Sequence, residues 1–249
     1  MKAIIIAAGI GNRLKPLTDN LPKCMLKFGG KTLLQRQLKV FNSCGIKDIG
    51  IIKGYKKEKI AYPGIKYYIN DDYENNNILN SLFYAGEAIK GEVIISYSDI
   101  LFRKQVVERL LESKKDISIV VDVDWRENYK GRRYHPTEEA EKVILDTDNN
   151  VLEIGKIVTK RHVHGEFIGM MKLTSRGSQI FKRHFDRVKQ LFWDKPFHTA
   201  STFKRAYLTD MIQDMVDSGV PVHSVIIKRS WKEIDTIEDY KKALKEFKE

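Results

Sequence analysis

The chain has 249 residues, 42% of them hydrophobic, which suits one large α/β domain or two small ones. Lys and Arg outnumber Asp and Glu by 44 to 33, but the cations are dispersed among acidic residues and match no RNA-binding motif. No apolar run reaches the roughly 18 residues of a membrane helix, and no secretory signal pattern is present. We therefore expect a cytoplasmic protein that binds neither nucleic acid nor membrane.

The first predicted element is a buried strand from Ala3 to Ala8, followed at once by the turn Gly9-Ile10-Gly11. Glycines let the backbone turn tightly and bring bare amides close to a ligand. Two cations, Arg13 and Lys23, follow the turn. A strand, a glycine turn and basic side chains in this order predict a phosphate-binding site.

Two common phosphate motifs do not fit this segment. The dinucleotide fingerprint requires a third glycine where Leu14 stands. A P-loop ending in Gly30-Lys31-Thr32 requires a glycine where Met25 stands.

Helical and strand patterns then alternate along the chain, which predicts an α/β fold with a mostly parallel sheet and helices on both faces. Helices are predicted for residues 32–44, 78–89, 104–113, 175–190, 207–217 and from 236, and strands for 48–53, 66–69, 92–98, 116–123, 167–172 and 222–228. We interpret residues 1–249 as one domain. Residues 124–165 are highly charged and contain a predicted hairpin at Asn149-Asn150, so we interpret them as a lid or insertion beside the site.

Two aspartates stand where ligands bind in open α/β sheets, beyond the ends of strands. Asp99 follows the predicted strand 92–98, and Asp235 lies between the last strand and the last helix. An isolated aspartate in such a place is at least as often a helix cap or a turn residue. Paired carboxylates are also the ligands that Mg²⁺ prefers.

The pattern Ala-Ala-Gly-x-Gly-x-Arg-Leu-x-Pro-Leu-Thr, followed by Pro-Lys-x-Met-Leu, resembles the opening of the sugar-nucleotidyltransferase superfamily. Its members join a nucleoside triphosphate to a phosphorylated small molecule. The segment Trp231–Thr236 also resembles a Trp-x-x-Ile-Asp-Thr element of this family. The resemblance implies a Rossmann-like fold, Mg²⁺ held by Asp99 and Asp235, and catalytic roles for Arg13 and Lys23.

The Asn-rich segment Asn75–Leu82 distinguishes this chain from sugar-specific members, which carry a Gln-x-x-x-x-Gly pattern here. It looks like the corresponding segment of cytidylyltransferases related to the phosphocholine enzyme, which implies CTP as the nucleotide. The residues that the resemblance places around the nucleotide are Ala7, Ala8, Gly9, Gly11, Asn76, Asn80, Ser81 and Ser98.

Residues 122–143 resemble a segment of cytidylyltransferases in phosphonate and phosphocholine pathways. The resemblance implies acceptor contacts from Arg132 and His135 to a phosphate, and from Glu166 to an amino group. Trp231 would face an ammonium group through a cation–π contact. Each of these residues is equally consistent with a charged surface or a packed core.

The expected reaction transfers CMP from CTP to phosphocholine, 2-aminoethylphosphonate or phosphoglutamine and releases pyrophosphate. We expect a monomer or homodimer that serves surface-polysaccharide decoration. Three alternatives remain open at this point: a sugar-1-phosphate nucleotidyltransferase that uses UTP or dTTP, a catalytically silent nucleotide-binding subunit, and a nucleic-acid-binding protein.

Overall fold

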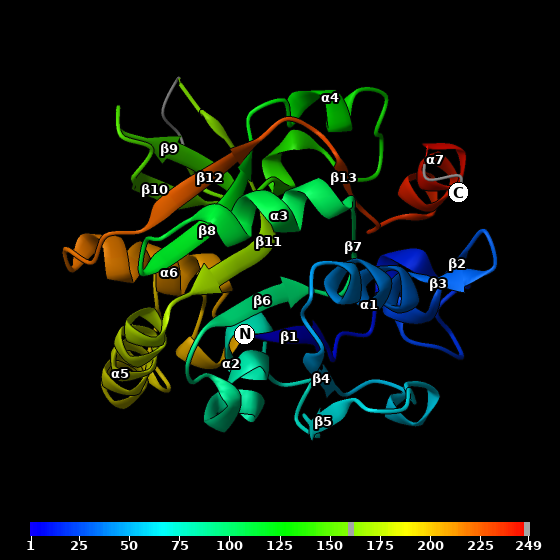
Figure 1. Ribbon diagram of the computed structural model, residues 1–249, viewed down its shortest axis with the longest axis horizontal. Helices are drawn as coiled ribbons and strands as arrows, with labels where there is room; N and C mark the ends of the chain where they lie inside the picture. The colour runs from blue at the N-terminus through cyan, green and yellow to red at the C-terminus, as the bar shows by residue number, and fades with distance from the viewer. Residues whose placement is uncertain (159–161, 247–249) are drawn as a thin grey trace.

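The computed structural model describes residues 1–158 and 162–246, built around a nine-stranded sheet (Figure 1). Its main path runs in the order β10-β9-β11-β6-β1-β4-β5, with β8 beside β11 and β12 beside β8. The strands are β1 Lys2–Ala7, β4 Asp48–Lys53, β5 Lys66–Ile69, β6 Val93–Tyr97, β8 Ile117–Asp122, β9 Lys142–Leu145, β10 Val151–Gly155, β11 Gly165–Leu173 and β12 His223–Ile227.

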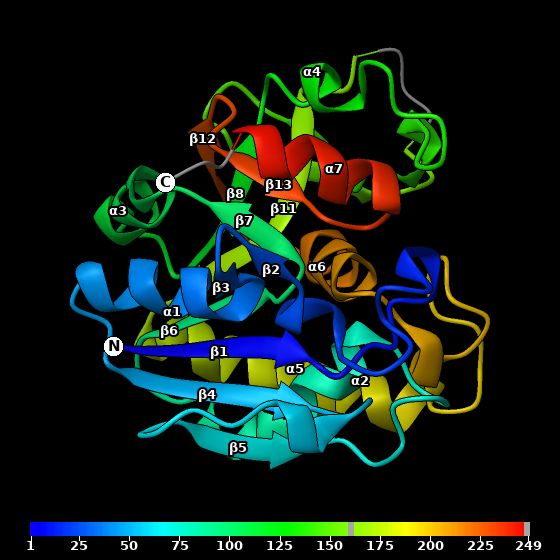
Figure 2. The same ribbon diagram turned by 90° about the vertical axis from the view of Figure 1, so that its right-hand side faces the viewer.

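The strands β5, β4, β1 and β6 are mutually parallel, and β12 is parallel to β8. The long strand β11 is the exception, because it runs antiparallel to β6, β8 and β9. The predicted α/β fold is confirmed. All parallel strands of the first half end at one edge, which in Figure 2 lies where the arrows of β1 and β4 point.

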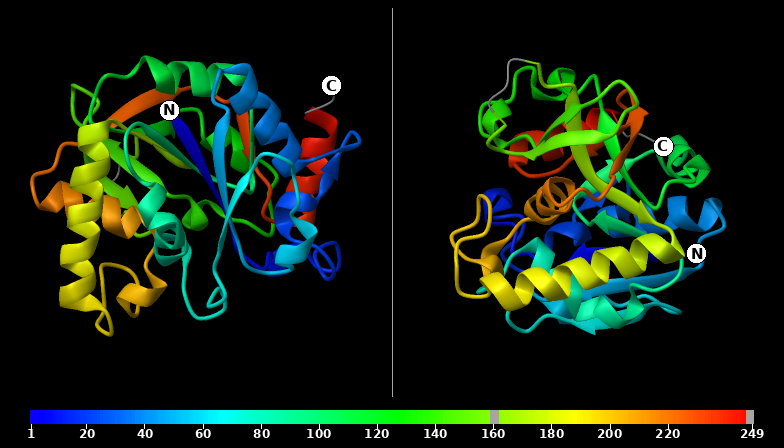
Figure 3. Two further views of the ribbon diagram at one scale, coloured as in Figure 1. Left: turned by 60° about the horizontal axis from the view of Figure 1, so that its bottom comes forward. Right: turned by 90° about the vertical axis from the view of Figure 1, so that its left-hand side faces the viewer.

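Helices cover both faces of this sheet. The helices α1 (Leu33–Ser43) and α3 (Lys104–Glu112) pack with Ala3, Ile5 and Ala7 of β1. The helices α2 (Ile78–Leu82), α5 (Ser175–Phe192) and α6 (Leu208–Asp217) pack with Ile4 and Ile6 on the opposite face. Figure 3 shows α5 lying lengthwise along this face. Burial on both faces explains why β1 is an unbroken apolar run.

Two small strand pairs complete the fold. The strand β7 (Ile100–Phe102) pairs antiparallel with β13 (Trp231–Glu233), and β2 (Lys27–Phe28) pairs with β3 (Lys31–Thr32). The last helix, α7 (Ile237–Glu246), begins where it was predicted, with a capping box in which Thr236 and Asp239 exchange hydrogen bonds. The sequence patterns did not predict β7 or β13.

The predicted hairpin is confirmed: β9 and β10 pair antiparallel, and Asn149 adopts a positive φ of 61° in the turn. This hairpin extends the sheet beside β11. In the chain, the short helix α4 (Arg126–Tyr129) lies between β8 and β9. Residues 159–161 of the expected lid lie outside the described residues. The predicted helix 78–89 is shorter than expected, since α2 gives way to 3-10 turns over Phe83–Ala88. Within the described ranges, none of the helices combines the length and apolar character needed to cross a bilayer.

Candidate active site

The turn after β1 forms the first wall of the site. Gly11 has φ 71°, and a Cβ built on it would lie 3.1 Å from Cβ of Lys23. The chain therefore needs glycine at this position both for its backbone conformation and for the close approach of Lys23. Thr18 fixes the turn by donating a hydrogen bond from Oγ1 to the Gly11 carbonyl at 2.9 Å.

The small β7·β13 pair brings the two predicted metal ligands together. Its register pairs Glu233 with Ile100, and the backbone N–H of Ile234 donates to the Asp99 carbonyl at 2.9 Å. Asp99 precedes β7 and Asp235 follows β13, so both side chains lie at the same end of this pair. The Lys23 ammonium bridges them, at 2.9 Å from Asp99 Oδ2 and 2.5 Å from Asp235 Oδ1.

The charges at this centre stabilise one another. Burial by itself would lower the pKa of Lys23, but Asp99, Asp235 and Glu233 outweigh it and raise the pKa above its ordinary value. Burial likewise opposes ionisation of Asp235, yet Lys23, His135 and Arg13 hold its pKa well below the ordinary range. Asp235 is therefore a carboxylate at neutral pH. Arg13 also forms an ion pair with it while remaining about half exposed.

A cavity of about 300 Å³ adjoins the cluster of Lys23, Asp99 and Asp235, which line it. It extends from the first loop to the segment before α2. Every residue predicted to contact the nucleotide, apart from Asn80, lines it together with the cations and carboxylates, as follows: Ala7, Ala8, Gly9, Gly11, Arg13, Lys23, Asn76, Ser81, Ser98, Asp99 and Asp235.

The polar groups on the far wall of this cavity are pre-arranged by a buried network. The fully buried Asn70 donates from Nδ2 to Asn76 Oδ1 at 3.0 Å and to Ser81 Oγ at 2.8 Å. Asn76 donates back to Asn70 Oδ1 at 3.1 Å. An amide N–H of Asn76 is left over for a ligand. Asn80 differs from the prediction, since its amide faces away and donates to the Phe203 carbonyl at 2.7 Å.

A second cavity of about 220 Å³ adjoins the first and shares Arg13, Asp99 and Asp235 with it. Three of the four predicted acceptor residues, His135, Glu166 and Trp231, line this second cavity. It is also lined by acids, aromatic rings and one lysine that were not predicted as acceptor contacts: Tyr97, Glu139, Glu141, Lys156, Phe167, Tyr207 and Glu233.

The fourth predicted acceptor residue, Arg132, has a different role. Its side chain is buried and bonds Asp239 at 2.8 Å, with Glu233 at 3.5 Å. The same Asp239 carboxylate caps α7, so Arg132 ties the loop before it to this helix. An acceptor phosphate would have to displace a buried carboxylate to reach this guanidinium.

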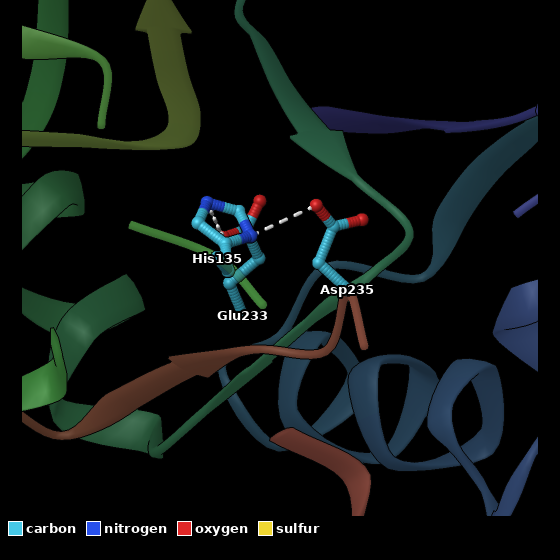
Figure 4. A group of neighbouring side chains, drawn as sticks. All are labelled: His135, Glu233 and Asp235. Carbon is cyan, nitrogen blue, oxygen red and sulfur yellow. Dashed lines mark ion pairs between the residues drawn. The ribbon is translucent and has the colours of Figure 1, made fainter. Parts of the chain in front are cut away.

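His135 connects the segment 130–140 to Glu233 and Asp235 (Figure 4). Its Nδ1 lies 3.1 Å from Asp235 Oδ2, and its Nε2 lies 3.5 Å from Glu233 Oε2. One ligand atom from each of the three residues falls within 4.8 Å of the others. Glu233 was not predicted, although it stands two residues before Asp235, the spacing that puts side chains on one face of a strand.

The residues at the junction of the two cavities fit a hard divalent cation. Oδ1 of Asp99 is buried and has no hydrogen-bond partner within the described chain. Together with Asp235 it offers carboxylate oxygens, the donors that Mg²⁺ takes from proteins while its other ligands come from water and phosphate. Lys23 already places a positive charge between these carboxylates, which indicates that the location favours a cation.

Fold and site together define an α/β enzyme that handles a phosphorylated ligand at the carboxyl ends of its parallel strands. Residues 3–205 match the family model of the MobA-like NTP transferase domain, and the chain belongs to this family of nucleotidyltransferases. Asp235 and the strand before it lie beyond the matched range.

Two curated relatives and one solved structure are similar to the chain. The CTP:phosphoglutamine cytidylyltransferase of Campylobacter jejuni is 28% identical over 252 residues, covering 96% of this chain and 97% of the relative. The choline-phosphate cytidylyltransferase of Streptococcus pneumoniae is 28% identical over 184 residues, 68% of this chain and 80% of the relative. The structure of CTP:phosphocholine cytidylyltransferase from Streptococcus pneumoniae has a TM-score of 0.74 at 24% identity, with 99% of both chains covered, and shares the fold.

Proposed function

We propose that this nucleotidyltransferase is a cytidylyltransferase: it transfers CMP from CTP to a small phosphorylated or phosphonylated acceptor that carries an amino group. The observation that carries the proposal is the pair of adjoining cavities, which share Arg13, Asp99 and Asp235 at their junction. A nucleotide in the first cavity and an acceptor in the second would meet at this junction.

In the proposed reaction, an acceptor phosphate oxygen attacks the α-phosphorus of CTP. The bond between that phosphorus and the bridging oxygen of pyrophosphate breaks, and pyrophosphate leaves with the electron pair. The nucleophile is already an anion, so no general base is required. The protein's task is to bring two anions together and to neutralise the charge that develops on the leaving group.

The chain's own cations suit that task. Arg13 is about half exposed and reaches the cavity from the loop beside Gly11, so its guanidinium can bind the triphosphate in a bidentate manner. Lys23 is buried and permanently charged, which makes it a fixed counter-charge next to the reacting phosphates.

We further propose Mg²⁺ as the metal, held by Asp99 and Asp235. When bound, it would neutralise phosphate charge and align the triphosphate for in-line attack. The unpartnered carboxylate oxygen of Asp99 and the all-oxygen donor pair support this assignment over a nitrogen- or sulfur-preferring metal.

The preference for CTP is supported by the Asn70–Asn76–Ser81 network and by the relatives. Amide and hydroxyl groups that are fixed by their own hydrogen bonds can read the donors and acceptors on a base edge. Both curated relatives described above are named as cytidylyltransferases.

The test is pyrophosphate release with each of the four ribonucleoside triphosphates and dTTP, in the presence of Mg²⁺. Each nucleotide is combined with phosphocholine, 2-aminoethylphosphonate, phosphoglutamine, phosphoethanolamine and glucose 1-phosphate. We expect turnover with CTP and an amino-bearing acceptor. Preference for UTP or dTTP with glucose 1-phosphate would replace the proposal with a sugar-1-phosphate transferase, and CTP binding without turnover would indicate a regulatory subunit.

We also propose that the enzyme works in the cytoplasm of a bacterium and that its product serves the decoration of a surface polysaccharide. The sequence's enrichment in Lys, Ile and Asn, typical of an AT-rich genome, supports a bacterial source. Deletion of the gene should remove a phosphorus-linked amine substituent from the purified polysaccharide, as measured by ³¹P NMR. An unchanged spectrum would contradict this setting without affecting the proposed reaction.

A further inference from the structure

The second cavity is unusually acidic for a site that receives a phosphorylated substrate. Besides Asp99, Glu139 and Asp235, three carboxyl groups line it from separate parts of the chain: Glu141 just before β9, Glu166 on β11 and Glu233 on β13. Acidic side chains enclosed in a small cavity repel one another and lose hydration, so such a cluster takes up protons or binds a positive charge.

Glu166 has hydrogen-bonding capacity left over. Its side chain is only 4% exposed. One oxygen, Oε1, accepts a hydrogen bond from Tyr129, while Oε2 has no partner within the described ranges. A buried carboxylate oxygen without a donor is costly, and a ligand N–H would satisfy it.

Glu141 is also weakly satisfied. Among the described residues, its oxygens accept only long hydrogen bonds, 3.4 Å from Tyr97 and 3.5 Å from Thr209. Burial raises the pKa of Glu141 to about 8. The positive charge of Lys156 lowers this pKa, whereas the negative charges of Glu233 and Asp99 raise it. Burial and Glu233 raise the pKa of Glu166 as well. A cationic ligand would relieve this repulsion.

The basic side chains of the cavity are held by other acids. Lys156 bonds Glu139 Oε2 at 2.9 Å, and Arg13 pairs with Asp235 and, at 3.9 Å, with Glu139. Beside Glu141 and Glu166, the carboxyl oxygens therefore have no close N–H donor among the described residues.

We infer that this cavity selects acceptors with a primary ammonium group, bound by Glu141 and Glu166, over acceptors with a quaternary ammonium group. The inference rests on the proposed function and names the substrate class of its acceptor site. A primary ammonium donates three hydrogen bonds, which matches the unpartnered oxygens. A quaternary ammonium donates none, is bulkier, and is recognised by aromatic cages.

The tyrosine hydroxyls near the cavity favour the first class. Tyr97 donates to Glu141 and Tyr129 donates to Glu166, so both hydroxyls orient the carboxyl groups of the glutamates. Sites built on hydrogen bonds reject analogues that lack the donor by large factors, because their own buried groups are then left unpaired.

The experiment compares phosphoethanolamine with phosphocholine, which differ only by three N-methyl groups. With CTP and Mg²⁺, kcat/KM for phosphoethanolamine should exceed that for phosphocholine by on the order of 100-fold. Glu166→Gln should reduce this ratio to about 10-fold or less, chiefly by raising KM for the primary amine. The exposed Glu87→Gln should leave the ratio unchanged.

The outcomes separate the two proposals. Turnover of phosphocholine equal to or faster than that of phosphoethanolamine overturns the inference while the proposed function stands. A Glu166→Gln protein that is folded by circular dichroism yet keeps the full ratio also overturns it. If that variant does not fold, Glu141→Gln is measured in its place and must lower the ratio. Absence of CTP turnover with every acceptor overturns the proposed function and the inference together.

Discussion

At the scale of single residues, the most informative feature is an ammonium group enclosed by two carboxylates. Lys23 contacts Asp99 and Asp235, which are 76 and 212 residues further along the chain. Removing the lysine from this cluster would leave two carboxylates near each other without the shared counter-charge. The same arrangement presents to a phosphate both a fixed cation and two oxygen ligands for a metal.

Asp99→Asn is expected to abolish turnover while the fold is retained. Asparagine keeps the shape of the side chain but removes the charge that a divalent cation requires. Loss of at least about 100-fold in kcat should be seen in the pyrophosphate assay, with little change in thermal unfolding. Asp48→Asn serves as the control and should be fully active, because Asp48 is the first residue of β4 and the site lies at the carboxyl ends of the parallel strands. An active Asp99→Asn enzyme would reduce Asp99 to a structural role.

Lys23→Met should make stability depend on magnesium. Without the ammonium, Asp99 loses its ion pair and Asp235 keeps only Arg13 and His135, so two carboxylates face each other without the charge between them. The free energy of unfolding should therefore fall by about 3 kcal/mol. Mg²⁺ should restore a large part of this loss by taking the place of the lysine charge. Denaturant unfolding with and without Mg²⁺ measures the effect. Lys104→Met, which removes an exposed pair with Glu108, should change stability little and show no such dependence.

Sequence patterns predicted many residues of the candidate site, but they did not predict which residues these side chains contact. The glycine turn, Arg13 and Lys23 are close in sequence, so their shared location was predictable. Arg132 was placed at the acceptor because its segment resembles one in cytidylyltransferases of phosphonate and phosphocholine pathways. In the structure it bonds Asp239, 107 residues away. The local sequence carries no sign of such a distant partner. Glu141 belongs to an acidic run in which nothing distinguishes the residue that turns inward.

At the scale of elements, the two-stranded β7·β13 pair positions Asp99 and Asp235, the two proposed metal ligands. Each strand has only three residues, too few for a periodic pattern, so the sequence did not predict the pair. The longer strands and helices were predicted because they contain enough residues for the apolar pattern to repeat. The antiparallel course of β11 was not predicted, because periodicity does not indicate direction.

Gly169→Ala should disturb the wall that separates the two cavities. Gly169 on β11 has φ 79°, and an added Cβ would lie 2.3 Å from the Tyr97 ring, which lines both cavities. We expect a loss of about 2 kcal/mol in stability and a higher KM for both substrates, because Tyr97 must move. The measurements are denaturant unfolding and steady-state kinetics.

Gly91→Ala provides the matched control for this prediction. Gly91 also has a positive φ, 69°, but an added Cβ meets nothing within 4 Å. It should therefore show the backbone strain, about 1 kcal/mol, without the kinetic effect. Equal KM values for wild type and Gly169→Ala would contradict the expectation that a shift of the Tyr97 ring weakens the binding of both substrates.

At the scale of the whole molecule, the buried acids couple stability to pH. The pKa of Glu141 is about 8 in the folded protein against an ordinary value of 4.5. Between these two values the folded state holds a proton that the unfolded state has released. The contribution of Glu141 is therefore fully present below about pH 4.5 and is lost as the pH rises to about 8.

Glu141→Gln should remove this part of the pH dependence. The free energy of unfolding of the wild type should fall with rising pH in this window, with a contribution from one group of at most about 1.4 kcal/mol per pH unit. In the variant this decline should be shallower, because glutamine does not titrate. Denaturant unfolding at pH 5, 6, 7 and 8 measures both slopes. Identical slopes would show that Glu141 is already ionised across this range.

The pairing of β7 with β13 also bears on when the enzyme becomes active during its synthesis. The glycine turn is made well before Asp235, which follows Gly11 by 224 residues. A prematurely terminated chain can therefore contain the glycine turn and Asp99 but lack β13 and Asp235. The proposed reaction needs both acids, so a chain that stops before β13 should not consume nucleotide.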